Sequence, residues 1–167
     1  MTSSERPRNM ESAVNMILKA AIAQHEEDPG SATPRRQVAA LPWEKRKGTL
    51  FVALVNSRET GRLVLPKGWP EKGMTDPQAA EQEAFEEAGL KGKMSNKIVG
   101  TYEYVKVIGP GFALPCIVDI YPMQVRKMLS SWPEKLERAR FWMTLEDAAK
   151  RVAEPALAEI LKNFKPV

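Results

Sequence analysis

Three glutamates in the segment 76–88 have the spacing that groups carboxylates on one side of a helix. Glu86 would lie about 60° to one side of Glu83, and Glu87 about 40° to the other, because successive helical residues are about 100° apart. Like charges three or four residues apart repel by about 0.2–0.5 kcal/mol per pair, and no lysine or arginine lies between residues 78 and 90 to relieve them. Two interpretations fit this pattern: a solvated acidic face, or a site for a hard dication such as Mg²⁺ or Mn²⁺, which prefers carboxylate oxygens.

A glycine-containing loop precedes these glutamates and favours the metal site. In the segment 65–70, LPKGWP, Lys67 provides a positive charge for phosphate, and Gly68 allows a main-chain carbonyl or N–H to approach a ligand closely. Alone, this segment is typical of an ordinary turn. Next to three aligned carboxylates, it indicates a cradle for a phosphate and a metal ion.

The acidic segment is expected to be a helix that packs on a sheet. Asp76 is the expected N-cap, Pro77 stands at the first helical position, and Gly89 follows where helices commonly end. Small residues recur at intervals of four on the face next to the glutamates, namely Ala80, Ala84 and Ala88. This face would let the helix lie close against its neighbour.

Short apolar runs around this helix predict strands. We expect strands at 37–42, 49–56, 63–65, 98–108, 112–123 and 140–143, and further helices at 144–153 and 155–164. Strands flanked by helices predict an α/β (α+β) fold, an α/β/α sandwich with a central mixed sheet.

An N-terminal extension, 1–34, is expected to precede the domain at 35–167. Apolar residues at helical spacing predict an amphipathic helix at 11–26, and the composition of 28–34 is that of a linker. We expect the helix to pack on the domain or on a second subunit, so a homodimer is possible.

The composition excludes several other chemistries. The only cysteine, Cys116, lies in an apolar run, and the only histidine is His25, so neither a usual zinc site nor a Ser-His-Asp triad is expected. A net charge of +4 and a pI of about 9.2 suit a polyanionic partner, but no arginine-rich tract indicates nucleic acid. The sequence contains no run of about 18 apolar residues, so no membrane span is expected. The N-terminal region lacks the apolar core of a signal peptide, so a cytoplasmic location is expected.

The loop and the helix together resemble the Nudix box, G-x5-E-x7-R-E-U-x-E-E-x-G-U, where U is an aliphatic residue. The matching positions are Gly68, Glu83, Glu86, Glu87, Gly89 and Leu90, with Ala84 as a small U. Met74 replaces the first glutamate of the box and Gln82 its arginine, two residues that in the family mainly support the loop and the carboxylates. The resemblance covers roughly residues 35–150. The segments 65–70 and 132–142 are similar to the branch with diphosphoinositol polyphosphate and dinucleoside polyphosphate hydrolases.

The resemblance implies metal-dependent hydrolysis of a pyrophosphate bond in a phosphorylated small molecule. The substrate would be nucleoside-diphosphate-linked or polyphosphorylated, with a dinucleoside polyphosphate or an inositol pyrophosphate favoured. The metal would be Mg²⁺ or Mn²⁺, bound by Glu83, Glu86, Glu87 and the carbonyl of Gly68. Lys67 would contact phosphate.

Further roles are assigned to residues outside the box. The proton of the attacking water would pass to Glu83 or to an acid in a later loop, for which Glu137 is the first candidate and Glu134 the second. Additional phosphates have as candidate ligands Arg58, Arg62, Lys135, Arg138 and Arg140, of which Arg62 and Arg140 are preferred.

Met74 and Gln82 leave one alternative open. A Nudix-like module that binds or senses a nucleotide, with weak or no hydrolysis, would tolerate both departures. The three retained helix glutamates favour the enzyme, because a pure sensor has no need of a metal cluster.

Overall fold

One mixed β-sheet runs through the part of the chain that the computed structural model describes, residues 34–166. The predicted helix at 11–26, His25 and most of the predicted linker lie outside these residues. The central strand β1 (Arg35–Arg46) pairs in parallel with β7 (Phe112–Met128) and antiparallel with β2 (Thr49–Asn56). The remaining strands are β3 (Leu63–Val64) and β8 (Arg140–Thr144) on β2, β4 (Lys67–Gly68) on β1, and β5 (Leu90–Met94) and β6 (Gly100–Gly109) on β7.

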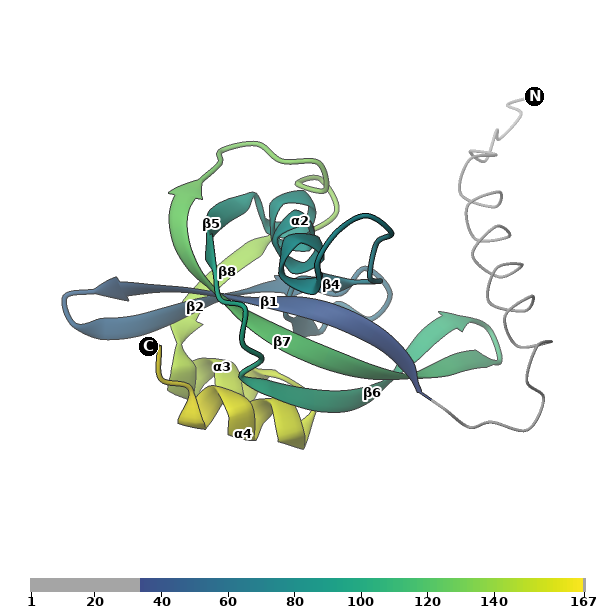
Figure 1. The fold of residues 1–167 in the computed structure, drawn as a ribbon. Helices are drawn as coiled ribbons and strands as arrows, with labels where there is room; N and C mark the ends of the chain where they lie inside the picture. The colour runs from purple at the N-terminus through teal and green to yellow at the C-terminus, as the bar shows by residue number, and fades with distance from the viewer. Residues whose placement is uncertain (1–33, 167) are drawn as a thin grey trace, which may run out of the picture.

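Helices cover both faces of the sheet (Figure 1). The helix α2 (Asp76–Ala88) lies on one face, and α3 (Leu145–Arg151) and α4 (Pro155–Asn163) lie on the other. The predicted α/β/α sandwich with a mixed sheet is therefore confirmed. None of the helices within residues 34–166 combines the length and the apolar character that a membrane span requires.

The alanine face of α2 packs directly on the sheet. Ala80, Ala84 and Ala88 are fully buried, against a layer that includes Val38 and Val55. Side chains this small bring the helix axis close to the strands, so the functional groups on its flank lie next to the sheet backbone.

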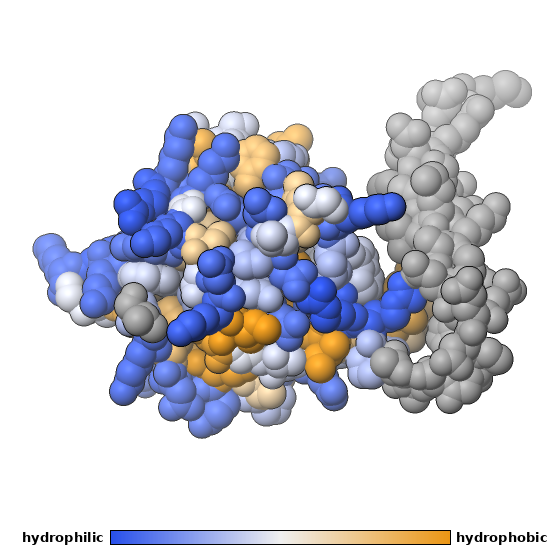
Figure 2. Space-filling model, in the orientation of Figure 1, coloured by the Kyte–Doolittle hydropathy of each residue, from blue (hydrophilic) through white to orange (hydrophobic). Residues whose placement is uncertain are grey.

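The opposite face carries the larger apolar core. Leu157 and Leu161 of α4 are fully buried together with Leu54 of β2 and Ile120 of β7. Cys116 is buried as predicted. Hydrophilic residues cover most of the face seen in Figure 2, and hydrophobic residues show in separate areas.

The ends of α2 follow local signals, with one correction. The helix bounds match the predicted 76–88, and Gly89 ends it with φ 64° in the left-handed region. The prediction of Asp76 as N-cap is wrong: Thr75 caps the helix and forms a capping box with Gln78. Asp76 instead accepts two hydrogen bonds from Arg36, at 2.9 and 3.1 Å, which fasten the start of α2 to β1.

Two strands were not predicted. Pro66–Thr75 was expected to be a loop, but its residues 67 and 68 form β4, and 90–94 form β5 against β7, which continues to Met128. The segment 90–94, LKGKM, alternates lysine with Leu90, Gly92 and Met94, but it is short and contains glycine and lysine, which are poor strand formers, so its strand conformation depends on pairing with β7.

Candidate active site

The two residues of β4 face opposite sides of the sheet. Gly68 pairs with Val38, which packs against α2, whereas Lys67 pairs with Ala39, which belongs to the core under α3 and α4. The backbone of β4 therefore runs beside the glutamates of α2, and the Lys67 side chain points to the other face. The ammonium of Lys67 lies 5.0 Å from the centre of the Tyr104 ring.

The carboxylate of Glu83 lies against the backbone of Gly68. A Cβ atom at residue 68 would stand 2.1 Å from Oε1 of Glu83, so only glycine leaves room for the carboxylate in this position. Glu83 is half-buried and makes no hydrogen bond or ion pair with another residue of 34–166. Burial raises its pKa to about 8, and the charges of Glu87 and Glu86 add to the increase.

Glu87, by contrast, is held at both carboxylate oxygens. Its side chain is buried; Oε2 accepts a hydrogen bond from the backbone N–H of Lys67 at 3.1 Å, and Oε1 lies 3.1 Å from Nη2 of Arg138. Burial raises the pKa of Glu87 to about 7, although Arg138 and Lys67 oppose this increase. The orientation of this carboxylate is fixed from two directions.

Glu86 has a third environment. Its Oε1 accepts a hydrogen bond from Nε2 of Gln82 at 3.0 Å, one helical turn earlier, and its backbone carbonyl accepts one from the N–H of Glu134 at 2.9 Å. Within residues 34–166, no three acidic, histidine or cysteine side chains already converge as a closed metal cage. The three helix glutamates are near one another but are not equivalent.

The donors around Glu83 fit a hard dication. Carboxylate oxygens are the ligands that Mg²⁺ and Mn²⁺ prefer. Among the described residues Glu83 has no basic partner, and the charges of Glu87 and Glu86 act on it; its carboxylate occupies the space beside Gly68 that a Cβ atom would fill. A cation at this point would relieve the repulsion that raises the pKa of Glu83.

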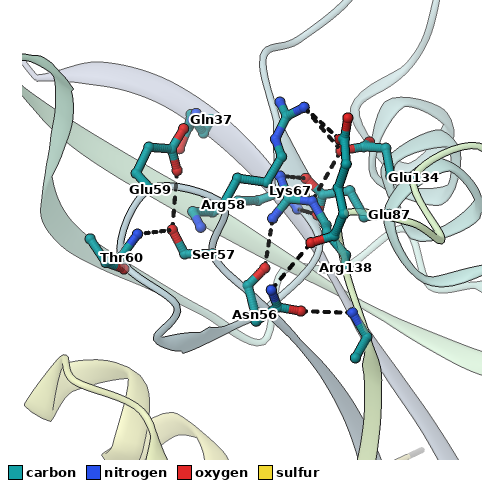
Figure 3. A network of polar contacts seen from close by, with 12 residues as sticks. Gln37, Asn56, Ser57, Arg58, Glu59, Thr60, Lys67, Glu87, Glu134 and Arg138 are labelled. Carbon is teal, nitrogen blue, oxygen red and sulfur yellow. Dashed lines mark hydrogen bonds and ion pairs between the residues drawn. The ribbon is translucent and has the colours of Figure 1, made fainter.

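The loop between β7 and β8 folds over the end of α2 (Figure 3). Arg138 is the only buried charged residue of this loop, and its Nε bonds Oε1 of Glu134 at 3.0 Å. Arg58 lies 2.9 Å from Oε2 of Glu137 and 3.6 Å from Oε1 of Glu134. Asn56, at the end of β2, fastens the loop by accepting the N–H of Ala139 at 2.7 Å.

The two candidate proton acceptors occupy different places. The charge of Glu134 contributes to the raised pKa of both Glu83 and Glu87, so Glu134 lies near the helix carboxylates. Glu137 is about half exposed, pairs with Arg58, and is not among the main charges that act on either helix carboxylate.

The face under α3 and α4 offers a groove beside Lys67. Arg62 and Tyr104 line a groove of about 300 Å³ together with Glu103 and Glu154. Burial lowers the pKa of Lys67 to about 8, and Glu87 opposes the decrease. The structure therefore brings Arg62 and Lys67 to one region through their shared neighbour Tyr104.

Arg140 has the contacts of a helix-capping residue. Its Nη1 donates to the carbonyls of Ala88 at 2.8 Å and Leu129 at 3.2 Å, and its guanidinium lies over the Trp132 ring. It satisfies carbonyls that α2 leaves free at its C-terminus. Arg138 also binds groups of the protein, in its case the carboxylates of Glu87 and Glu134. The contacts with α2 have no local sequence signal, because they join residues 51 or 52 positions apart along the chain; the pair of Arg138 with Glu134, four residues earlier, is the local one.

Comparison with known proteins identifies the domain. The model of the NUDIX domain matches residues 33–164. Nudix hydrolase 16, mitochondrial, from Arabidopsis thaliana is 32% identical over 66% of this chain, and the match covers 62% of that relative's length. Diphosphoinositol polyphosphate phosphohydrolase 3-alpha from Homo sapiens is 27% identical, over 78% of each chain.

Solved structures agree on the fold. The Ap4A hydrolase of C. elegans superimposes with a TM-score of 0.56 over 78% of this chain and 95% of that chain, at 17% identity. A NUDIX hydrolase from Nitrosomonas europaea gives a TM-score of 0.59 over 78% of this chain and 87% of that chain, at 18% identity.

Proposed function

Because the chain belongs to the NUDIX domain family, we propose that it hydrolyses a pyrophosphate bond in a phosphorylated small molecule with the help of a divalent cation. The observation that carries this proposal is the half-buried Glu83 carboxylate, which lies against Gly68 and beside the oriented carboxylate of Glu87, with no basic partner among the residues that the structure describes.

Mg²⁺ or Mn²⁺ would be held by Glu83, Glu87 and Glu86, with the carbonyl of Gly68 as a further donor. A bound cation would neutralise charge on the phosphate and activate the attacking water. Glu83 is free to bind without losing another contact. Glu87 is already oriented by its two partners, and Glu86 would exchange its hydrogen bond with Gln82.

For the proton of the attacking water we favour Glu134 over Glu137. Glu134 interacts electrostatically with the helix carboxylates, whereas Glu137 is paired with Arg58 outside their reach. Glu83 remains the alternative acceptor on the helix. Replacement of Glu134 by Gln should lower kcat and remove the acidic limb of the pH–rate profile, and Glu137→Gln should leave that limb in place. The reverse pattern would assign the proton to Glu137.

Phosphate groups would contact Lys67, whose charge acts on Glu87, and Arg62, which lines the groove with Tyr104. Among the relatives, one is named for diphosphoinositol polyphosphate and one for Ap4A, so an inositol pyrophosphate and a dinucleoside polyphosphate are the first substrates to test. Arg140 is not included, because its contacts are with the end of α2.

The test is phosphate release from a panel of pyrophosphate substrates with Mg²⁺, with Mn²⁺ and with a chelator. We expect turnover of at least one substrate, its loss with chelator, and its loss in the variant Glu87→Gln with the fold intact. Glu81→Gln, on the same helix, serves as the control and should retain turnover. Equal turnover by Glu87→Gln would exclude this site. Tight binding of a nucleotide without any release would favour the alternative of a binding module.

Three wider expectations stay predictions. Neither the homodimer nor the N-terminal extension has a test within the described residues. The cytoplasmic location is also untested, and several plant relatives are named mitochondrial or chloroplastic.

A further inference from the structure

The buried side chain of Arg138 joins three parts of the chain around the proposed site. Its Nη2 pairs with Glu87 on α2, its Nε with Glu134 in the loop before β8, and its Nη1 donates to the backbone carbonyl of Asn56 at the end of β2, at 3.1, 3.0 and 3.0 Å (Figure 3). Each nitrogen therefore has its own acceptor. The planar guanidinium can serve all three only in one orientation.

We infer that Arg138 is a positioning residue of the active site, which holds Glu87 of α2 and Glu134 of the β7–β8 loop in a fixed relation to each other. The inference rests on the proposed function, since it concerns the carboxylates that would bind the metal and accept the proton. It assigns to Arg138 the relative placement of Glu87 and Glu134, not a contact with phosphate.

Residue 82 supplies no positive charge to the helix glutamates, and Glu87 pairs with a cation from another part of the chain. The Nudix box has arginine here, but Gln82 is neutral, and its amide reaches Glu86 rather than Glu87. Glu87 is the most buried of the three helix glutamates. Among the residues that the structure describes, Arg138 is the basic side chain in ion-pair contact with it. A buried carboxylate without such a partner would be protonated or displaced.

The contrast between Glu83 and Glu87 shows what Arg138 achieves. Both oxygens of Glu87 are engaged, one by Arg138 and one by the N–H of Lys67, so its carboxylate plane is set before any ligand arrives. Glu83 has no such partner within residues 34–166. The same guanidinium also holds Glu134, which otherwise belongs to an irregular loop. One side chain thus couples a helix carboxylate to a loop carboxylate.

If Arg138 bound a phosphate group of the substrate, its guanidinium would have to be arranged differently. An arginine that binds phosphate needs free N–H groups directed to the substrate, but Nε, Nη1 and Nη2 of Arg138 are all directed to protein oxygens. The nearby Arg58 is half exposed, and its ion pairs among the described residues are with Glu137 at 2.9 Å and Glu134 at 3.6 Å. The two arginines share Glu134 but differ in burial, and of the two only Arg138 also pairs with Glu87.

The test measures Mn²⁺ binding by electron paramagnetic resonance in Arg138→Lys and Arg138→Gln, alongside kcat and KM on the best panel substrate. Removing a partner that orients a metal ligand typically weakens metal binding about 10–100-fold, so we expect the Kd for Mn²⁺ to rise at least about tenfold in both variants. Lysine should not rescue, because a point charge cannot bridge two carboxylates and a carbonyl. The value of kcat should fall while KM stays unchanged.

The matched control is Arg36→Lys, which alters another arginine that pairs with an acid of α2, Asp76 at the opposite end. This variant should bind Mn²⁺ as the unsubstituted chain does. If Arg138→Gln fails to fold, Arg138→Lys, which retains the charge, decides the question. An unchanged Kd for Mn²⁺ in folded Arg138→Lys, or an equal loss of Mn²⁺ affinity in Arg36→Lys, would overturn this inference and leave the proposed function standing. Failure of the unsubstituted chain to bind Mn²⁺ and to turn over any substrate would overturn the proposed function as well.

Discussion

The substitution Gly68→Ala separates the chemistry of the site from the stability of the fold. Gly68 does not have a left-handed φ, so an alanine can adopt its backbone conformation. The three atoms nearest to the added methyl group would all belong to the end of the flexible Glu83 side chain. We therefore expect Gly68→Ala to fold normally and to displace the carboxylate.

The size of the displacement follows from the contact distance. The new Cβ would stand 2.1 Å from Oε1 of Glu83, whereas ordinary contact begins at 3.4 Å, so the carboxylate must retreat by about 1.3 Å. A misplacement of about 1 Å can reduce catalysis by about 100-fold. The reduced entropy of the unfolded chain contributes about 0.4–1 kcal/mol to stability. An off-rotamer Glu83 costs about 0.5–1.5 kcal/mol. These two effects nearly offset each other.

The assay combines steady-state phosphate release, Mn²⁺ binding and urea denaturation. We expect kcat/KM to fall by about two orders of magnitude and the Kd for Mn²⁺ to rise, with a free energy of unfolding within about 1 kcal/mol of the original. Gly109→Ala is the matched control, because a Cβ atom there meets nothing within 4 Å. Full activity in Gly68→Ala would refute the placement of Glu83 against β4. A large loss of stability would refute the view that only a side chain has to move.

Three further predictions test other parts of the site. Arg140→Gln should lower the free energy of unfolding by about 1–3 kcal/mol and leave KM unchanged, because it removes the donor to the carbonyls at the end of α2. Urea denaturation and steady-state kinetics measure these two quantities. A raised KM with unchanged stability would indicate that Arg140 contacts the substrate. In the metal-free protein, the folded-state pKa values of Glu83 and Glu87, about 8 and about 7, exceed the ordinary 4.5. The folded state then binds protons more tightly than the unfolded state, so this contribution to stability is present below about pH 4.5 and is lost as the pH rises to about 8. Thermal unfolding should show the melting temperature declining over this range relative to Glu83→Gln, and parallel curves would contradict the assignment. Tyr104→Phe should cost about 1–3 kcal/mol in urea denaturation, because the buried Gln37 loses its hydrogen-bond donor; an unchanged midpoint would show that this bond does not matter.

Local signals made the acidic helix predictable. Proline at its start and glycine after its end delimit 76–88, and the glutamate spacing follows from helical geometry. The choice between two adjacent capping residues was not predictable from type alone, since threonine and aspartate both cap well. It was decided by Arg36, which binds Asp76 from a distant strand.

Non-local pairing accounts for what was missed. The segment 90–94 becomes a strand because β7 offers it hydrogen bonds, whereas the alternation in LKGKM is too short, and too rich in lysine and glycine, to predict a strand alone. Arg138 and Arg140 were grouped as candidate phosphate ligands because both are basic. Their actual partners, a carboxylate on α2 and carbonyls at its end, depend on how the loop folds back over the helix. Such contacts are set by tertiary structure.

The strand β4 has only two residues, and this restricts where the chain can accept insertions and deletions. Because side chains alternate along a strand, a one-residue insertion or deletion between β3 and β4 would exchange the sides to which residues 67 and 68 point. The lysine side chain would then point toward α2, and glycine would take its place beside Tyr104. Length changes should therefore be tolerated in the segment 70–74, beyond the paired dipeptide, and rejected at 65–66, a pattern that a library of single-residue insertions would reveal.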